Sequence, residues 1–271
     1  EDFVDTLKGK LALNAHLEGS VAQPRGTIRL IGTNLDLDAQ KLEKVDLLSK
    51  LDGKRIWIDP IKITVAKDES IEGRGWFSYE KAYQFGLVSK GISFTNIDKI
   101  LDQKAVSGKI AFDISGIGTF EDPGIKGEIA LKNLFIQGKP ANDVNLHLDV
   151  HDQLASVSAN SNFDFNASFH LKKKDFWLSV LFDETDLSPY LKITGRDDFS
   201  GSLTGKMEAK GNTEAVERIE GFVDFSQLDL FFDQKQILHS RNFKIFFRNE
   251  EIFIPGIRLD LLTEGYILHP R

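Results

Sequence analysis

Alternation of apolar and polar residues with a period of two constrains the fold of this 271-residue chain more than any other feature. Successive side chains of a β-strand point to opposite faces, so this alternation predicts strands with one apolar and one wet face. The pattern recurs along the whole sequence and indicates an all-β protein of antiparallel strands, about eighteen in number. Clear examples are residues 61–65, 144–150, 163–171, 243–247 and 257–261.

Helical spacing is rare. Between residues 39 and 51 apolar side chains recur every three residues, which predicts one short helix. They are Leu42, Val45, Leu48 and Leu51. Residues 97–101 and 187–191 are predicted to form brief helical connectors, with Asn96 and Asp186 as N-caps.

The composition agrees with β-structure and excludes several classes of function. The chain has 21 Phe, 22 Gly, 7 Pro and only 1 Met, which fits strands separated by glycine turns. Its mean hydropathy is -0.22, and no apolar run approaches the roughly 18 residues of a membrane-spanning helix. The net charge of -7 without any Lys/Arg block argues against a nucleic-acid partner.

No residues stand out as catalytic, cofactor-binding or metal-binding. Cysteine is absent, which rules out disulfides, thiolate metal sites and Cys nucleophiles. His147 and His151 lie four residues apart, but on a strand they share a face two periods apart and would need further ligands to hold a metal. The sequence therefore predicts a protein that is not an enzyme and that needs no cofactor.

A strand-turn-strand pattern occurs three times, and each copy opens with two glycines ten residues apart. The pairs are Gly9 with Gly19, Gly108 with Gly118 and Gly201 with Gly211. The copies divide the chain at residues 7–105, 106–198 and 199–271, the last copy incomplete, within one continuous repetitive segment. Since the sequence begins Glu1-Asp2-Phe3, we expect it to be a piece of a longer polypeptide.

The repeat resembles those of the TamB/AsmA-like proteins of diderm bacteria. It shares Gly-x-Leu/Ile-x-Leu/Phe, a second Gly ten residues on, a Pro before Gly-x-Ile-x-Leu, and then an Asn-Leu element at Asn34-Leu35 and Asn133-Leu134. The third copy lacks the Pro. The resemblance covers nearly the whole chain.

The resemblance implies a long β-sheet bent like a taco around an apolar trough. It further implies a periplasmic location, with the parent protein anchored in the inner membrane outside this segment. The partners it implies are phospholipids or their acyl chains, passing between the inner and outer membranes. A variant of this function is assembly of outer-membrane proteins together with a barrel partner of the TamA type.

Generic apolar side chains on the alternating strands are the candidate lining of that trough, because they contact acyl chains without selecting a head group. The candidates are Ile28, Leu30, Ile61, Ile63, Val65, Phe163, Phe165, Phe169, Leu171, Phe243, Ile245 and Phe247. A different interpretation stays open. A repeat of about 95 residues is also the size of an immunoglobulin-like domain, so the chain could be a structural or adhesive array of β-sandwiches.

Overall fold

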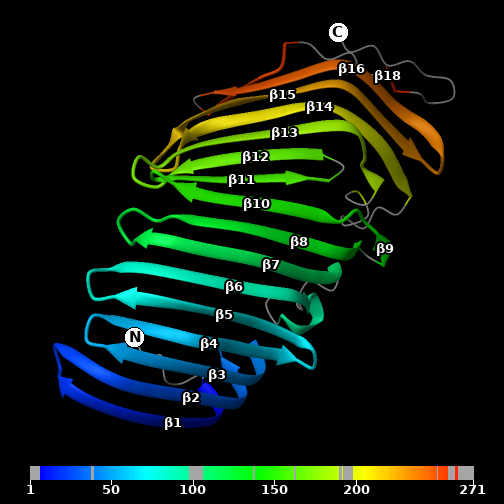
Figure 1. Ribbon diagram of the computed structural model, residues 1–271. Helices are drawn as coiled ribbons and strands as arrows, with labels where there is room; N and C mark the ends of the chain where they lie inside the picture. The colour runs from blue at the N-terminus through cyan, green and yellow to red at the C-terminus, as the bar shows by residue number, and fades with distance from the viewer. Residues whose placement is uncertain are drawn as a thin grey trace. The chain divides into compact units, whose positions relative to one another are not determined.

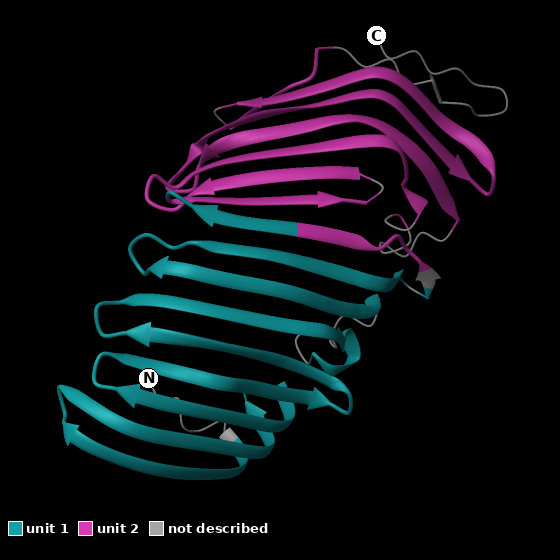
Figure 2. Ribbon diagram, in the orientation of Figure 1, with its two compact units in different colours: residues 1–138, 147–152 teal, residues 139–146, 153–271 magenta. Residues whose placement is uncertain are grey.

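The computed structural model describes residues 7–37, 40–97, 106–136, 138–161, 163–188, 191, 198–248, 250–255 and 260–261. The chain forms two compact units (Figure 2). Unit 1 comprises residues 1–138 and 147–152, and unit 2 comprises residues 139–146 and 153–271.

Eight long strands build unit 1, and each pairs antiparallel with the next along the chain (Figure 1). They are β1 (Leu7–Ser20), β2 (Gln23–Leu37), β3 (Gln40–Asp52), β4 (Arg55–Ala66), β5 (Glu69–Ser78), β6 (Ala82–Ser93), β7 (Val106–Thr119) and β8 (Ile125–Ile136). A 3₁₀ turn, η1 (Phe94–Asn96), follows β6 and packs against β7. Strand order in this unit therefore follows chain order.

Unit 2 repeats this plan from β11 to β16, again with antiparallel pairing between successive strands (Figure 1). These strands are β11 (Leu154–Asn160), β12 (Phe163–His170), β13 (Asp175–Asp186), β14 (Phe199–Asn212), β15 (Ala215–Phe232) and β16 (Lys235–Arg248). Two short strands, β17 (Glu251–Phe253) and β18 (Asp260–Leu261), both pair with β16. The short β9 (Lys139–Pro140) belongs to unit 2, and β10 (Val144–His151) has residues in both units.

The fold class predicted from the sequence is confirmed: the chain is all-β, antiparallel and built of open sheet. Among the described residues, the substantial contacts between elements are those of neighbouring strands and of β7 with η1. The chain exposes 18359 Å² of accessible surface, whereas two separate compact proteins of half its mass would together expose about 14,000 Å². No described helix is long and apolar enough to cross a membrane.

The helix predicted for residues 39–51 is wrong, because this segment is strand β3. The three-residue spacing of apolar residues that predicted a helix depends on Leu48, which lies between Val45 and Leu51. In the structure Leu47 carries the apolar alternation, since it pairs with Leu30 on one side and Ile61 on the other. Leu48 instead pairs with Arg29. Pairing with two neighbouring strands outweighs a weak local preference.

The predicted connectors are only partly described. Residues 98–101 of the first lie outside the described part of the chain, as do residues 189 and 190 of the second. In the second, the backbone N–H of Leu191 donates to the carbonyl of Leu187 over 2.9 Å, which is one helical turn. Asp186 caps it as predicted, because its carboxylate accepts the N–H of Ser188 over 2.8 Å.

The first two repeats share a bulge that explains their Asn-Leu element. Asn34 and Asn133 have left-handed φ angles of 49° and 52°, and the register of the facing strand shifts at Gly9 and Gly108. A Cβ at Gly9 would lie 2.5 Å from the carbonyl oxygen of Asn34. Asn tolerates the left-handed region better than most residues. Each bulge buries the following leucine, Leu35 or Leu134, to 5% and 8% exposure.

Strand pairing crosses both predicted repeat boundaries. In unit 1, β6 pairs with β7 from Ala82↔Thr119 to Ser93↔Lys109. In unit 2, β13 pairs with β14 from Asp175↔Asn212 to Asp186↔Ser202. The alternative of one β-sandwich per repeat is therefore not the observed architecture, because adjacent repeats share a sheet at each boundary.

Candidate functional site

The apolar face of unit 1 consists of the side chains that the strand register places in rows across all eight strands. Paired residues of neighbouring strands lie on the same face. The central row begins with Leu13 of β1 and ends with Gly127 of β8, and it carries no charged residue. Its members are Leu13, Leu30, Leu47, Ile61, Gly73, Leu87, Ile114 and Gly127.

A bulge at Asp59 and Pro60 keeps β4 in phase with this face. Ile58 and Ile61 are three residues apart, a spacing that would put them on opposite faces of a regular strand. The register assigns Ile58 to Ser49 and Ile61 to Leu47, so two residues of β4 oppose one residue of β3. The bulge absorbs the extra residue, and both isoleucines lie on the apolar face. Proline, which lacks a backbone N–H, is tolerated at such a position.

The apolar face of unit 2 is built in the same way and is richer in aromatic side chains. One row joins five strands through Phe165, Val180, Met207, Val223 and Ile245. The adjacent row, here called the phenylalanine row, consists of Phe163, Phe182, Gly205, Phe225 and Phe243.

Ring contacts run along the whole phenylalanine row. Centroids lie 6.3 Å apart for Phe163 and Phe182, 6.4 Å for Phe182 and Phe225, and 6.1 Å for Phe225 and Phe243. Phe182 and Phe225 meet across β14 because residue 205 is glycine, where a Cβ would lie 2.8 Å from the Phe225 ring. Phe247 covers Gly221 in the same manner, with a ring atom 2.3 Å from the position of a Cβ. Glycines thus let large side chains lie against the sheet.

The structure brings together most of the predicted lining. Leu30 and Ile61 share the central row of unit 1, with Ile28 and Ile63 in the rows beside it. Phe163, Phe165, Phe169, Phe243, Ile245 and Phe247 all lie on the apolar face of unit 2. Val65 lies where the register of β4 with β5 shifts. Leu171 lies in the turn after β12, where its N–H donates to the carbonyl of Gln153 over 2.7 Å.

Every one of the twelve predicted lining residues is half-buried, and none is in the buried core. A closed core would have enclosed them, so this degree of exposure is what an open face predicts. The prediction missed Leu47, Leu87, Val180 and Val223, which complete the rows. Their signal was the same alternation, because Phe176, Leu178, Val180 and Phe182 occupy every second position of β13.

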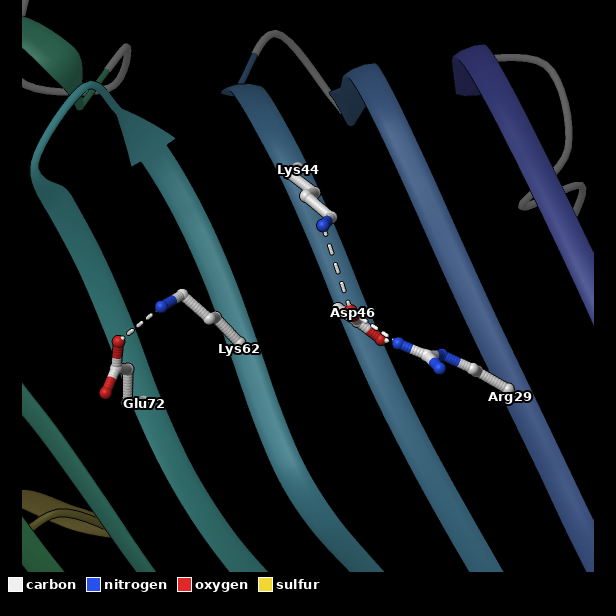
Figure 3. A network of polar contacts seen from close by, with 5 residues as sticks. All are labelled: Arg29, Lys44, Asp46, Lys62 and Glu72. Carbon is white, nitrogen blue, oxygen red and sulfur yellow. Dashed lines mark hydrogen bonds and ion pairs between the residues drawn. The ribbon is translucent and has the colours of Figure 1, made fainter.

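The opposite face of unit 1 is polar and carries ion pairs between strands (Figure 3). Arg29 donates to both carboxylate oxygens of Asp46 over 3.3 and 3.1 Å, and Lys44 lies 3.8 Å from the same carboxylate. The hydrogen bond from Arg29 is the main cause that lowers the pKa of Asp46. Lys62 pairs with Glu72 over 2.8 Å. The Asp46 side chain is 16% exposed, whereas its cationic partners and the Lys62–Glu72 pair are exposed. Ion pairs with exposed members add little stability, but their charges make this face polar.

In the described part of the chain the polar faces carry hollows that the alternation pattern does not predict. The larger, of about 1030 Å³, crosses β4, β5, β6 and β7 in unit 1. The smaller, of about 460 Å³, surrounds Trp177, Phe222 and Phe246 in unit 2. The sequence feature that could have indicated these hollows is a tryptophan at alternate positions with charged residues, as Trp57 is with Arg55 and Asp59 in β4.

The described residues contain no cluster of three or more His, Cys, Asp or Glu side chains that could hold a metal ion. His147 and His151 each pair with a carboxylate of their own. The Nδ1 of His147 lies 2.5 Å from Glu128, and that of His151 lies 2.9 Å from Asp149. Such pairs between exposed groups on a sheet need no further function to explain them.

The sequence matches no protein-family model, and neither the curated proteins nor the solved structures include one similar to it.

Proposed function

We propose that the chain binds phospholipid acyl chains on its apolar faces and conducts them from one membrane to another, as its resemblance to TamB/AsmA-like repeats implies. The observation that carries the proposal is the row of paired apolar residues that continues through eight strands of unit 1 without a charge. The rows of unit 2 support it in the same way.

The energetic need for such a surface is large. Transfer of one methylene from water is worth about 0.8 kcal/mol, so a sixteen-carbon chain crossing water faces a barrier on the order of 10 kcal/mol. A surface whose apolar side chains are already partly exposed offers contact at every strand. No unfolding is then needed for entry of the lipid.

The chemistry of the face fits a bulk carrier. The side chains of the central row have no polar atoms, so they impose no fixed partner on a head group, which can stay in water. On this proposal none of them does chemistry, and the segment is not an enzyme. The parent protein would be anchored in the inner membrane, with this segment in the periplasm.

Native mass spectrometry of the purified chain, combined with lipid extraction, is the first test. We expect phospholipid or fatty acid from the expression host to copurify. Phe247→Asp places a charge on the apolar face of β16, whereas Phe246→Asp places the same charge on its polar face. Bound lipid should be lost in the first variant and kept in the second.

Transfer of a fluorescent phospholipid between donor and acceptor vesicles tests conduction itself. Phe165→Asp and Ile63→Arg should abolish the transfer while circular dichroism shows an intact sheet, because both residues lie on an open face. Gross unfolding of these variants would instead indicate that the face is normally covered. A lipid-free wild-type protein, or equal loss in both β16 variants, would overturn the proposal.

A second candidate, assembly of outer-membrane proteins with a TamA-type barrel, is favoured by strand β1. Its described register is with β2, and the side chains of residues 8–20 are all exposed. An exposed edge strand is a template for pairing with another β-protein. Successive N–H groups of a strand point to opposite sides, so Asn14→Pro and Ala15→Pro affect different edges of β1. The variant that keeps wild-type stability should lose capture of the purified barrel, and unchanged capture would argue against this role.

A further inference from the structure

The larger hollow lies on the polar face of unit 1, opposite the apolar face discussed above, and three rows of the register define it. One wall is the row of Trp57, Trp76 and Gln84. The other wall is the row of Lys62, Glu72, Val88 and Asp113. Between them run Arg74, Gly86 and Ser115. The hollow is therefore a transverse groove with one aromatic wall and one charged wall, and we call it the tryptophan groove.

Two of the three residues between the walls of the tryptophan groove, Gly86 and Ser115, are small. Gly86 is the central one, and a Cβ built on it meets no heavy atom within 4 Å. Other strand glycines of this unit, such as Gly73 and Gly116, lie under large side chains of the apolar face. Gly86 instead opens onto empty space on the polar face. Four strands at a spacing of about 4.8 Å make a groove on the order of 15 Å long.

The aromatic wall is held in place before any ligand arrives. The indole N–H of Trp57 donates to Asp52 over 3.0 Å, and that of Trp76 donates to Gln84 over 3.1 Å. The two ring centroids are 6.1 Å apart, and the Arg55 guanidinium lies 4.4 Å from the Trp76 ring centroid. Trp57 is nevertheless 39% exposed. An oriented, exposed indole offers a flat apolar surface at low entropic cost.

The charges of the groove balance. Arg55, Lys62 and Arg74 supply three cationic groups, and Asp59, Glu72 and Asp113 supply three carboxylates. A phosphate or nucleic-acid ligand calls for an excess of cations, which this lining lacks. It does supply many hydrogen-bond donors and acceptors beside the indole rings. Pyranose rings, with apolar C–H faces and hydroxyl edges, match both walls.

We propose that the tryptophan groove binds an extended, uncharged oligosaccharide, with pyranose faces against Trp57 and Trp76 and hydroxyl groups toward the Glu72 and Asp113 wall. The site does not depend on the lipid function, because it lies on the other face of the sheet. The chain would then hold lipid on one face and a glycan on the other.

Calorimetric titration tests this with four probes: hexamers of β-1,4-linked glucose, β-1,4-linked N-acetylglucosamine and α-1,4-linked glucose, and inositol hexakisphosphate as an anion. We expect at least one hexasaccharide to bind and to bind more tightly than the anion. Gly86→Phe fills the groove from its open floor and should weaken binding at least tenfold. Ala130→Phe adds the same ring to the polar face of β8, outside the groove, and should leave binding unchanged.

A matched tryptophan pair covers the case in which Gly86→Phe fails to fold. Trp57 and Trp177 are equally exposed, at 39% each, but only Trp57 lines the groove. Trp57→Ala should weaken hexasaccharide binding at least tenfold, and Trp177→Ala should not. The proposal is overturned if no hexasaccharide binds at concentrations up to about 10 mM. It is also overturned if the anion binds more tightly than every hexasaccharide, or if Trp57→Ala and Trp177→Ala change the binding equally.

Discussion

Gly108 and Asn133 face each other where strands β7 and β8 change register. Gly108 has a φ of 155°, and a Cβ there would lie 2.9 Å from the Leu134 side chain and 3.0 Å from the carbonyl oxygen of Lys132. The glycine is thus required by both backbone conformation and space. The same arrangement at Gly9 and Asn34 shows why these residue types recur in the first two repeats.

Gly108→Ala is expected to lower the free energy of unfolding by about 1–3 kcal/mol, the usual cost of a strained backbone position. Gly86→Ala is its control, because the added Cβ meets open space and has no left-handed φ to strain. That control should be neutral or stabilising by up to about 1 kcal/mol. Urea unfolding followed by circular dichroism measures both, and equal effects would show that the bulge does not require glycine.

Asp52 anchors the exposed indole of Trp57. The hydrogen bond from Trp57, followed by those from the N–H groups of Lys54 and Arg55, lowers the pKa of the Asp52 carboxyl from 3.8 to about 2. A depressed pKa means that the interaction is fully present above the unfolded-state value. It is lost as the pH falls from there through about 2.

The indole N–H resonance of Trp57 should therefore titrate in an NMR series with a midpoint near the pKa of Asp52, about 2. The Trp76 resonance is the internal control, since its acceptor is the amide of Gln84, which does not titrate. Asp52→Asn should remove the transition at Trp57. A shared midpoint for both tryptophans would report general acid unfolding instead.

At the scale of the strand, the phenylalanine row is the best test of how the apolar face is held together. Its four rings come from four strands and contact one another side by side. Aromatic pairs add about 0.5–1.5 kcal/mol beyond their buried area. For half-buried rings the lower end of that range applies.

A double-mutant cycle with Phe225→Ala and Phe243→Ala should give a coupling of about 0.5 kcal/mol or more in urea unfolding, because these rings are stacked with an interplanar angle of 11°. The same cycle with Phe163 and Phe243, at opposite ends of the row, should give a coupling within about 0.3 kcal/mol. Equal coupling in both cycles would mean that the rings do not interact pairwise.

The strands themselves could be predicted from the sequence. Which residues of a strand lie on the apolar face could not always be predicted. Alternation located β4, but only the register shows that Asp59 and Pro60 form a bulge that keeps Ile58 and Ile61 on one face. In β3 the adjacent Leu47 and Leu48 are compatible with two periodicities, and the helical one is wrong. Which leucine belongs to the apolar face depends on the partner strands, which single-sequence patterns do not include.

The two candidate surfaces differ in the same way. The apolar face could be predicted, because residues such as Phe163 and Phe165 need only alternation to be assigned to one face. The tryptophan groove could not, because Trp57, Trp76 and Gly86 lie on three different strands. Trp57, Trp76 and Gly86 are brought together by the pairing of β4, β5 and β6. The space above Gly86 is open because glycine has no side chain.

For the whole molecule, the shared sheets predict how the chain resists proteolysis. Since β6 pairs with β7 and β13 with β14, cleavage between repeats leaves hydrogen-bonded partners on both sides. Limited proteolysis should therefore yield no stable fragments of about 95 residues, the size of one repeat. Accumulation of three such fragments, identified by mass spectrometry, would show that each repeat is a separate domain.

Because the long strands of each unit pair in chain order, the contacts that build each sheet are local in sequence. Such low contact order favours rapid folding for a β-protein. A strand leaving the ribosome can add to the hairpin made just before it, without waiting for a distant segment. The same property makes length easy to change during evolution, since inserting or deleting one hairpin leaves every other pairing intact.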